Sequence, residues 1–132
     1  MAEVFEVEFA QPAADYRPNG GGNRWRRARL AKKMRQQAYL VALAQLREEP
    51  LRWAAFCPKV YDLVWYFWAG PGPDEDNVVA SCKALLDGCA DALWVNDRVL
   101  HLGEVHRVRV QRRSPKAGRL LIRFYEEVGE GA

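Results

Sequence analysis

The sequence lacks long apolar runs and has few cysteines, and we expect no secretory leader. No uninterrupted apolar stretch reaches the roughly 18 residues that a membrane-spanning helix needs, so we expect no membrane span. The amino terminus carries neither the basic region nor the apolar core of a signal peptide. Three cysteines in 132 residues are too few for a disulfide framework. These absences predict a single cytoplasmic domain, spanning residues 1–132, with reduced cysteines.

Nucleotide-binding loops and zinc sites are also absent. The glycines at 20–22 are not followed by the G-x-x-x-x-G-K-[ST] pattern that cradles phosphates. Without such a cradle, a phosphotransferase or glycosyltransferase that uses an acidic D-x-D motif is disfavoured. The only two histidines, His101 and His106, lack the spacing of zinc ligands. We interpret both as ordinary sheet or surface residues.

Charge is unevenly distributed along the chain, although the net charge is only +3. Residues 16–47 hold nine basic side chains and no acid, and residues 98–123 hold eight against one acid. Residues 48–97 hold nine acids against three bases. Two basic zones around an acidic centre indicate an enzyme that binds phosphates and uses metal to cut them. The plainer alternative is that these charges only solvate helix and strand surfaces.

Apolar periodicity predicts an α/β (α+β) fold in the order β-α-β-α-β-β, a mixed sheet with helices packed on it. Strands are expected at 4–9, 60–68 and 105–111, followed by a last strand with Leu120, Ile122 and Phe124 facing the core. A helix from Arg24 to about Glu48 is expected to bury the following stripe: Leu30, Met34, Val41 and Ala44. On the strand at 105–111 we expect Val108 and Val110 to face inward.

The most informative stretch is the acidic motif Asp74-Glu75-Asp76-Asn77, which follows the apolar strand and a Gly-Pro loop. In extended backbone, Asp74 and Asp76 would point the same way. Two carboxylates held together repel each other unless a cation lies between them. Mg²⁺ favours a few carboxylate oxygens, with water and phosphate completing its octahedron. Alone, the motif could equally be a solvated turn.

The following segment, Asp76 to Leu93, reads as a helix with an apolar stripe, and Asp76 is its expected N-cap. Lys83 lies two turns beyond Asp76, from where its long side chain could reach back toward the acids. Asp87 follows Lys83 by four residues and could hold the lysine stem, unless the two form only an exposed ion pair. After the bend at 95–97, Asp97 could supply a third carboxylate.

This spacing resembles the core of the RusA family of Holliday-junction resolvases. The similarity lies in the D-x-D-N motif, the helix with Lys83 and Asp87, and the downstream Asp97. The flanks are similar too, with Arg17-Pro18-Asn19 and Trp25 on one side and residues 116–119 on the other. The resemblance covers nearly the whole chain, but only the central motif is specific.

The resemblance implies a Mg²⁺-dependent endonuclease, with Mn²⁺ as a substitute, that resolves four-way junctions as a homodimer. It implies Asp74, Asp76 and Asp97 as metal ligands and Lys83 as the essential lysine. Candidate dimer contacts are Val7, Phe9 and the apolar side of the long helix. The expected DNA-binding side chains come from the two basic zones and are Arg24, Arg26, Arg27, Arg29, Lys33, Arg113, Lys116 and Arg119.

One departure from the family pattern favours an alternative function. Family members often carry arginines immediately before the D-x-D, whereas the loop at 69–73 has no charge. The alternative is a catalytically silent protein that keeps the fold and binds junctions. Asp97→Asn separates the two. In the enzyme it should abolish cutting and leave junction binding intact, whereas the silent protein has no cutting to lose.

The tryptophans near the motif have a structural interpretation. We expect Trp65, Trp68 and Trp94 to lie in the core rather than to stack on bases. Trp25, which lies among arginines, is expected to pack against a partner, although base stacking is the alternative there.

Overall fold

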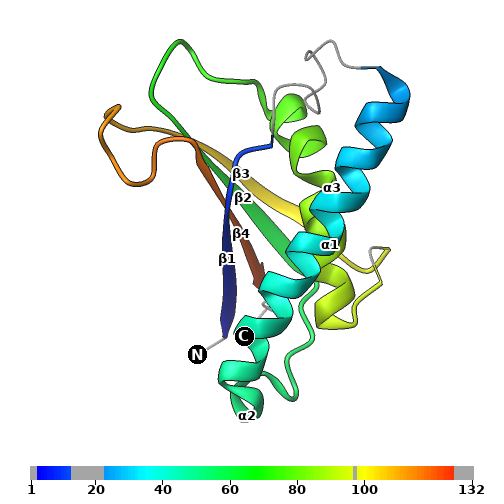
Figure 1. Ribbon diagram of the computed structural model, residues 1–132. Coiled ribbons are helices and arrows are strands. Elements are labelled where there is room, and N and C mark those ends of the chain that lie inside the picture. The colour runs from blue at the N-terminus through cyan, green and yellow to red at the C-terminus, as the bar shows by residue number, and fades with distance from the viewer. Residues whose placement is uncertain (1–2, 13–22, 97, 127–132) are drawn as a thin grey trace.

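The chain forms a four-stranded mixed sheet with two long helices packed together (Figure 1). The computed structural model describes residues 3–12, 23–96 and 98–126. The elements in chain order are β1 (Val4–Ala10), α1 (Arg24–Glu48), α2 (Pro50–Trp53), β2 (Val60–Phe67), α3 (Glu75–Leu93), β3 (His101–Arg109) and β4 (Arg119–Tyr125). The predicted α+β class and element order are confirmed, with the single turn of α2 as an addition.

The sheet has the strand order β1-β4-β2-β3. β4 pairs antiparallel with both β1 and β2, whereas β2 and β3 are parallel and are joined through α3. A parallel crossover places the end of its first strand beside the start of its helix. The acidic motif therefore lies at one end of the sheet. Figure 1 shows the turn between β3 and β4 at that same end.

Alternating apolar residues on β1 and β4 form the sheet side of the core, as their period of two predicts. Phe5 is paired with Phe124, Val7 with Ile122, and Phe9 with Leu120. All six are buried, at 5% relative exposure or less. This placement overturns one expectation, because Val7 and Phe9 are buried within the single chain and are not free to form a dimer contact.

The buried stripe of α1 differs from the predicted one. The two fully buried residues are Ala38 and Ala42, whereas Val41 is 39% exposed and Ala44 is exposed. Small residues lie inside because α3 approaches closely: a Cβ added at Gly88 would lie 2.8 Å from the Ala38 Cβ. Hydropathy favoured the larger side chains, but the spacing between the helices leaves room only for alanine.

The two long helices run side by side in the same direction. Ala31 of α1 lies beside Ala84 of α3 around a shared hollow, and four residues further on Arg35 forms two hydrogen bonds with Asp91, at 2.8 and 2.9 Å. Since the contacts advance together along both helices, their amino-terminal ends lie at the same end of the molecule, as Figure 1 shows. The basic first turns of α1 therefore lie at the same end as the acidic motif.

β3 is an edge strand, and it begins four residues earlier than the strand predicted at 105–111. Val108, which was expected to face inward, is 36% exposed. Val105 is the β3 residue that packs against the core. Val108 is exposed because β3 has a neighbouring strand on one side only, so its other side is open to solvent. Within the described part of the chain, no helix is long and apolar enough to cross a membrane.

Trp94 ends α3 in the left-handed conformation, with φ 58° and ψ 36°. Its amide donates to the Asp91 carbonyl and the Val95 amide to the Ala90 carbonyl, the hydrogen-bond pair of a Schellman cap. Its side chain is 93% exposed, which overturns the expectation that it lies in the core. Glycine is the preferred residue at such a position, because a Cβ is strained there.

Trp94→Gly is therefore expected to stabilise the fold by about 1 kcal/mol, since it relieves backbone strain and removes few contacts. Thermal unfolding followed by circular dichroism should show a melting temperature higher by roughly 4 °C. A lower melting temperature would mean that this exposed indole is stabilised by a contact that the single chain does not contain.

Candidate functional site

The candidate site lies where β2 ends and α3 begins. Between them, the loop at 68–73 turns through Gly70 and Gly72, whose φ angles are +68° and +78°. A Cβ at Gly72 would lie 3.0 Å from the ring of Phe67, so the loop folds back onto that ring. Both glycines are required by their positive φ. The loop delivers Asp74 directly to the start of α3.

Asp74 is the N-cap of α3, and the predicted extended arrangement of the acids is wrong. Its side chain accepts a hydrogen bond from the Asn77 amide at 2.9 Å, and the helix begins at Glu75. Asp76 therefore lies in the first turn and is not the cap. The reason is local: an aspartate is among the best N-caps, and Asp74 is the first one after the prolines of the loop.

Both aspartates of the motif remain at the start of α3, two residues apart. Asp74, Glu75 and Asp76 are all exposed at the amino-terminal end of α3, where the helix dipole stabilises carboxylates. One oxygen of Asp74 is engaged by the backbone amide of Asn77, which leaves its second oxygen and the carboxylate of Asp76 for other ligands. Two carboxylates in one exposed turn are a donor set that Mg²⁺ accepts when water and phosphate complete it.

Lys83 forms the predicted pair with Asp87. Its ammonium donates to the Asp87 carboxylate at 2.9 Å, an i,i+4 ion pair on α3. Lys83 begins about 10.5 Å further along the helix than Asp76, seven residues at 1.5 Å each. The bond to Asp87 directs the ammonium away from Asp76, so the expected reach back toward the acids is not the arrangement seen.

The third predicted ligand, Asp97, lies outside the described residues. Its neighbour Asn96 follows the carboxy-terminal end of α3 and accepts a hydrogen bond from the Arg98 amide at 2.9 Å. The 19 residues of α3 span about 28 Å. In the ranges that the structure describes, no three His, Cys, Asp or Glu side chains gather closely enough to hold a metal. A three-carboxylate centre therefore stays a prediction.

The first three turns of α1 carry the predicted DNA-binding cations of the first basic zone. Asn23 caps this helix by accepting from the Arg26 amide at 2.8 Å. The first turn holds no acid, and basic side chains at this end oppose the helix dipole. This concentration of cations is unfavourable for the helix itself, because no acid of the first turn offsets it. The side chains concerned are Arg24, Arg26, Arg27, Arg29 and Lys33.

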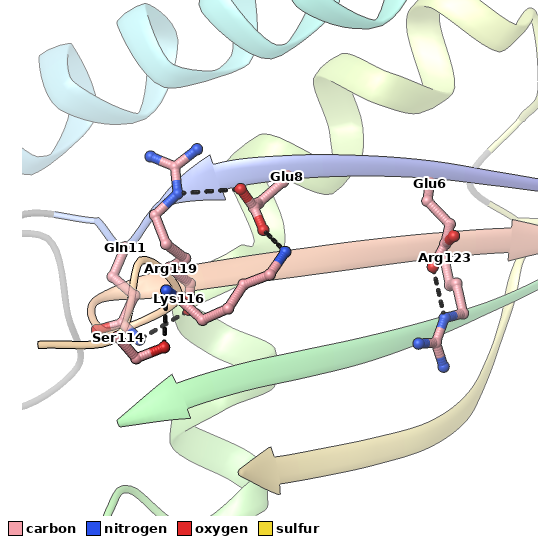
Figure 2. A network of polar contacts seen from close by, with 7 residues as sticks. All are labelled: Glu6, Glu8, Gln11, Ser114, Lys116, Arg119 and Arg123. Atoms are coloured by element: carbon pink, nitrogen blue, oxygen red, sulfur yellow. Dashed lines mark hydrogen bonds and ion pairs between the residues drawn. The ribbon is translucent and has the colours of Figure 1, made fainter. Parts of the chain in front are cut away.

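Two predicted DNA-binding cations at the other basic zone are engaged by an acid. Lys116 forms an ion pair with one oxygen of Glu8, and Arg119 lies 3.3 Å from the other (Figure 2). The hydrogen bond from Lys116, together with the charges of both cations, lowers the pKa of the Glu8 carboxyl below its ordinary 4.5. Arg113, the third predicted residue there, is exposed. The positive charge of this turn is thus partly cancelled.

If this turn binds DNA, as the sequence predicts, Glu8→Gln should strengthen that binding, because it frees two cations for phosphates. The slope of log K against log salt should steepen by about 0.9 for each cation gained, measured by fluorescence anisotropy over a salt series. Glu6→Gln is the matched control, since Glu6 makes a similar pair with Arg123 at 2.9 Å on the same face (Figure 2). Equal effects of the two substitutions would show that only net charge matters.

The same pair makes a prediction about pH. Because the folded-state pKa of Glu8 is lowered, its ion pair adds stability above about pH 4.5, and that contribution is lost as the pH falls through the lowered value. Wild type should therefore exceed Glu8→Gln in melting temperature at neutral pH, with the difference vanishing in acid. A difference that grows in acid would contradict the assignment.

The sequence analysis did not identify two arginines that donate hydrogen bonds to the uncharged loop at 69–73. In the parallel register, Phe67 of β2 is paired with Arg109 of β3, and Arg107 lies two residues earlier on the same strand. Arg109 donates to the Gly70 carbonyl at 2.5 Å, and Arg107 donates to the Pro73 carbonyl at 3.4 Å. The positive charge that the loop lacks in sequence is therefore supplied by the neighbouring strand.

Aromatic side chains at this end of the sheet are covered by cations. The guanidinium of Arg109 lies 4.9 Å from the ring centre of Phe67, and that of Arg112 lies 5.1 Å from Trp68. Trp68 is 46% exposed, so the expectation that it belongs to the core is wrong, whereas Trp65 is buried at 3%. Trp68 lies one residue beyond the end of β2, which places it outside the covered part of the sheet.

These elements enclose a cleft of about 720 Å³ beside the acidic motif, which we call the aromatic cleft. Aromatic residues 65–68 form one wall, the loop at 71–73 forms the rim, and α3 contributes polar residues. The lining residues used below are Gln11, Tyr66, Trp68, Asp74, Asn77 and Ser81. The acids, the arginines and the cleft thus share one end of the molecule.

No protein-family model matches this sequence, and no curated protein is similar enough to count as a match.

Proposed function

We propose that this chain is a Mg²⁺-dependent endonuclease that resolves Holliday junctions or related branched DNA. The observation that carries the proposal is the position of exposed carboxylates at the start of α3, where Asp74 lines the aromatic cleft and the adjoining loop accepts hydrogen bonds from Arg107 and Arg109. Asp74 and Asp76 are the proposed ligands on α3, and Asp97 is the third. Cations on both flanks of an acidic centre would bring phosphate to the metal rather than repel it.

The available carboxylates fit a magnesium site in which the protein supplies only one or two of the six ligands. Mg²⁺ retains several waters and is commonly bound through one or two carboxylates plus substrate phosphate. Asp74 and Asp76 supply such a pair within one exposed turn, and Mn²⁺ accepts the same oxygen ligands. When bound, the ion would polarise the scissile phosphate and lower the pKa of an attacking water. Asp74 is also fixed by its cap bond, which holds its carboxylate in place.

The remaining roles fall to side chains of this chain. Arg107 and Arg109 would hold the phosphates that flank the scissile bond, and the basic turns of α1 would hold a neighbouring arm. Lys83 would stabilise the charge that develops on the phosphate, or position the water. Since its ammonium is held by Asp87, this role requires the lysine to exchange that partner for phosphate when DNA binds.

Resolution of a four-way junction needs two symmetric nicks, and a homodimer supplies two sites by symmetry. The described surface still offers one of the predicted contacts, the apolar side of α1, where Leu40 and Val41 are exposed. We also propose a reducing cytoplasmic setting, in which the unpaired thiols of Cys57, Cys82 and Cys89 persist.

The second candidate is a catalytically silent protein that binds junctions. One observation favours it: the ammonium of Lys83 is directed toward Asp87 and not toward the acids at the start of α3. The arginines of β3 weaken the earlier argument from the uncharged loop, because they restore positive charge beside it. Both candidates share the DNA-binding surface and differ only in cutting.

The test is a synthetic four-way junction with each strand labelled in turn, incubated with and without Mg²⁺ beside a linear duplex. We expect paired nicks at symmetric positions in two opposing strands, only with metal, and an intact duplex. Tight, salt-sensitive binding without nicks would select the silent alternative. Neither binding nor cutting would overturn both candidates.

A further inference from the structure

The aromatic cleft has the size and lining of a nucleotide site. Its volume of about 720 Å³ lies within the roughly 300–1,000 Å³ of small-ligand pockets. Such sites combine apolar and aromatic walls with a few polar groups that fix orientation. We propose that this cleft receives one unpaired nucleotide of a DNA strand, with its base against Trp68 and its phosphates at Arg109 and Arg112. The inference takes DNA as the partner from the proposed function and is otherwise independent of cutting.

Trp68 is the feature that favours a base. The indole of Trp68 is 46% exposed at the end of β2, so part of its ring is accessible to a ligand in the cleft. Aromatic side chains on which bases stack are the common device of proteins that bind single strands, because every base offers a flat face. The guanidinium of Arg112, 5.1 Å from the indole ring, adds a cation beside the stacking surface.

The cations at the rim make a nucleotide a better occupant than an apolar peptide. Arg109 is held by the neutral carbonyl of Gly70 at 2.5 Å, so this contact orients its charge without cancelling it. Lys116 also lies near this wall, 5.7 Å from the ring of Tyr66, but its charge is partly cancelled by Glu8. The positive charges of Arg109 and Arg112 beside an aromatic wall complement a base joined to phosphates better than they complement an apolar segment.

Polar residues of the cleft can read the edge of the base. Asn77 lies on the cleft side of α3 and is partly exposed, whereas Ser81, one turn further on, is buried at 2%. Gln11 fixes the opposite wall, since its amide nitrogen donates to the carbonyls of Tyr66 at 2.6 Å and Arg119 at 3.0 Å. A base in duplex DNA is stacked and its pairing edge is occupied, so only an unpaired base can enter. Branch points and gaps supply such bases.

The proposal is tested with a duplex that carries one unpaired 2-aminopurine, compared with the fully paired duplex. Binding is measured by anisotropy and by quenching of 2-aminopurine, without divalent metal so that no cutting occurs. We expect the wild-type chain to prefer the unpaired site and to quench its fluorescence. Trp68→Ala should lose about tenfold of that preference, the loss expected for one base–aromatic stack, and Trp68→Phe should restore part of it.

Trp94→Ala is the matched control, because Trp94 is also exposed but lies at the far end of α3. Equal melting temperatures of the variants establish that each is folded. An unchanged preference in Trp68→Ala, or an equal loss in Trp94→Ala, would overturn the proposal. Competition by free deoxyadenosine monophosphate at the same affinity would instead identify a free-nucleotide site. A chain that binds the unpaired base yet never cuts would refute only the proposed endonuclease.

Discussion

Asp76→Asn is expected to abolish Mg²⁺-dependent cutting of a four-way junction while leaving junction binding intact. The amide has the shape of the carboxylate but carries no charge, so a bound Mg²⁺ would lose one of its two proposed ligands on α3. Changes to residues that merely support metal ligands already cost about 10–100-fold, and loss of a ligand should reduce the nicking rate by at least about 10³-fold. Binding should persist or tighten slightly, because a negative charge near phosphates is removed.

Glu75→Gln is the matched control for this prediction. Glu75 lies between the two proposed ligands, in the same exposed first turn of α3, and its substitution removes the same charge. Single-turnover nicking rates and junction affinities of the two variants would be compared with those of wild type. Equal loss of rate in both variants would mean that the charge of the turn matters rather than a specific ligand. Cutting by Asp76→Asn at the wild-type rate would remove Asp76 from the site.

Gly88→Ala is expected to have the largest effect on stability. The added Cβ would lie 2.2 Å from the Arg35 carbonyl oxygen and 3.0 Å from the Tyr39 amide nitrogen, both backbone atoms of α1. Relief requires the two helices to separate, which exceeds the usual overpacking cost of about 1–3 kcal/mol. We expect a loss of at least about 3 kcal/mol and a melting temperature lower by roughly 10–15 °C.

The direction of the stability change in Gly88→Ala shows whether α1 and α3 are in close contact. At an exposed helical position, the exchange of glycine for alanine stabilises by up to about 1 kcal/mol through helix propensity. Gly118→Ala is a useful control, because no atom lies within 4 Å of the added Cβ there and only its positive φ opposes the change. Unfolding in urea would give both free energies. A Gly88→Ala variant as stable as wild type would show that α1 and α3 are not in close contact.

The buried face of a strand could be predicted wherever apolar and polar residues alternate along the sequence. Phe5, Val7 and Phe9 alternate with exposed residues, and the alternation alone identifies which face is covered. The interface between the helices was not predictable in this way. Ala38 and Ala42 are buried because Gly88 lets the backbones approach, a contact between segments about 50 residues apart. Hydropathy along α1 does not contain that information.

The candidate site shows the same division. The sequence identified the acids and the Lys83–Asp87 pair, since their relation depends on spacing within one helix. It placed the cap wrongly, because both Asp74 and Asp76 are good capping residues. The relation between Arg109 and the loop depends on the parallel register of β2 and β3. Such a register joins distant segments, so no local pattern could reveal it.

The most direct test of the central claim is the initial rate of junction nicking as a function of Mg²⁺ concentration, at constant ionic strength. If the acids at the start of α3 hold a catalytic ion, the rate should rise from zero and saturate in the millimolar range, with the linear duplex uncut throughout. Tight binding of the junction without nicking at any Mg²⁺ or Mn²⁺ concentration would contradict the account and leave a DNA-binding protein without catalysis.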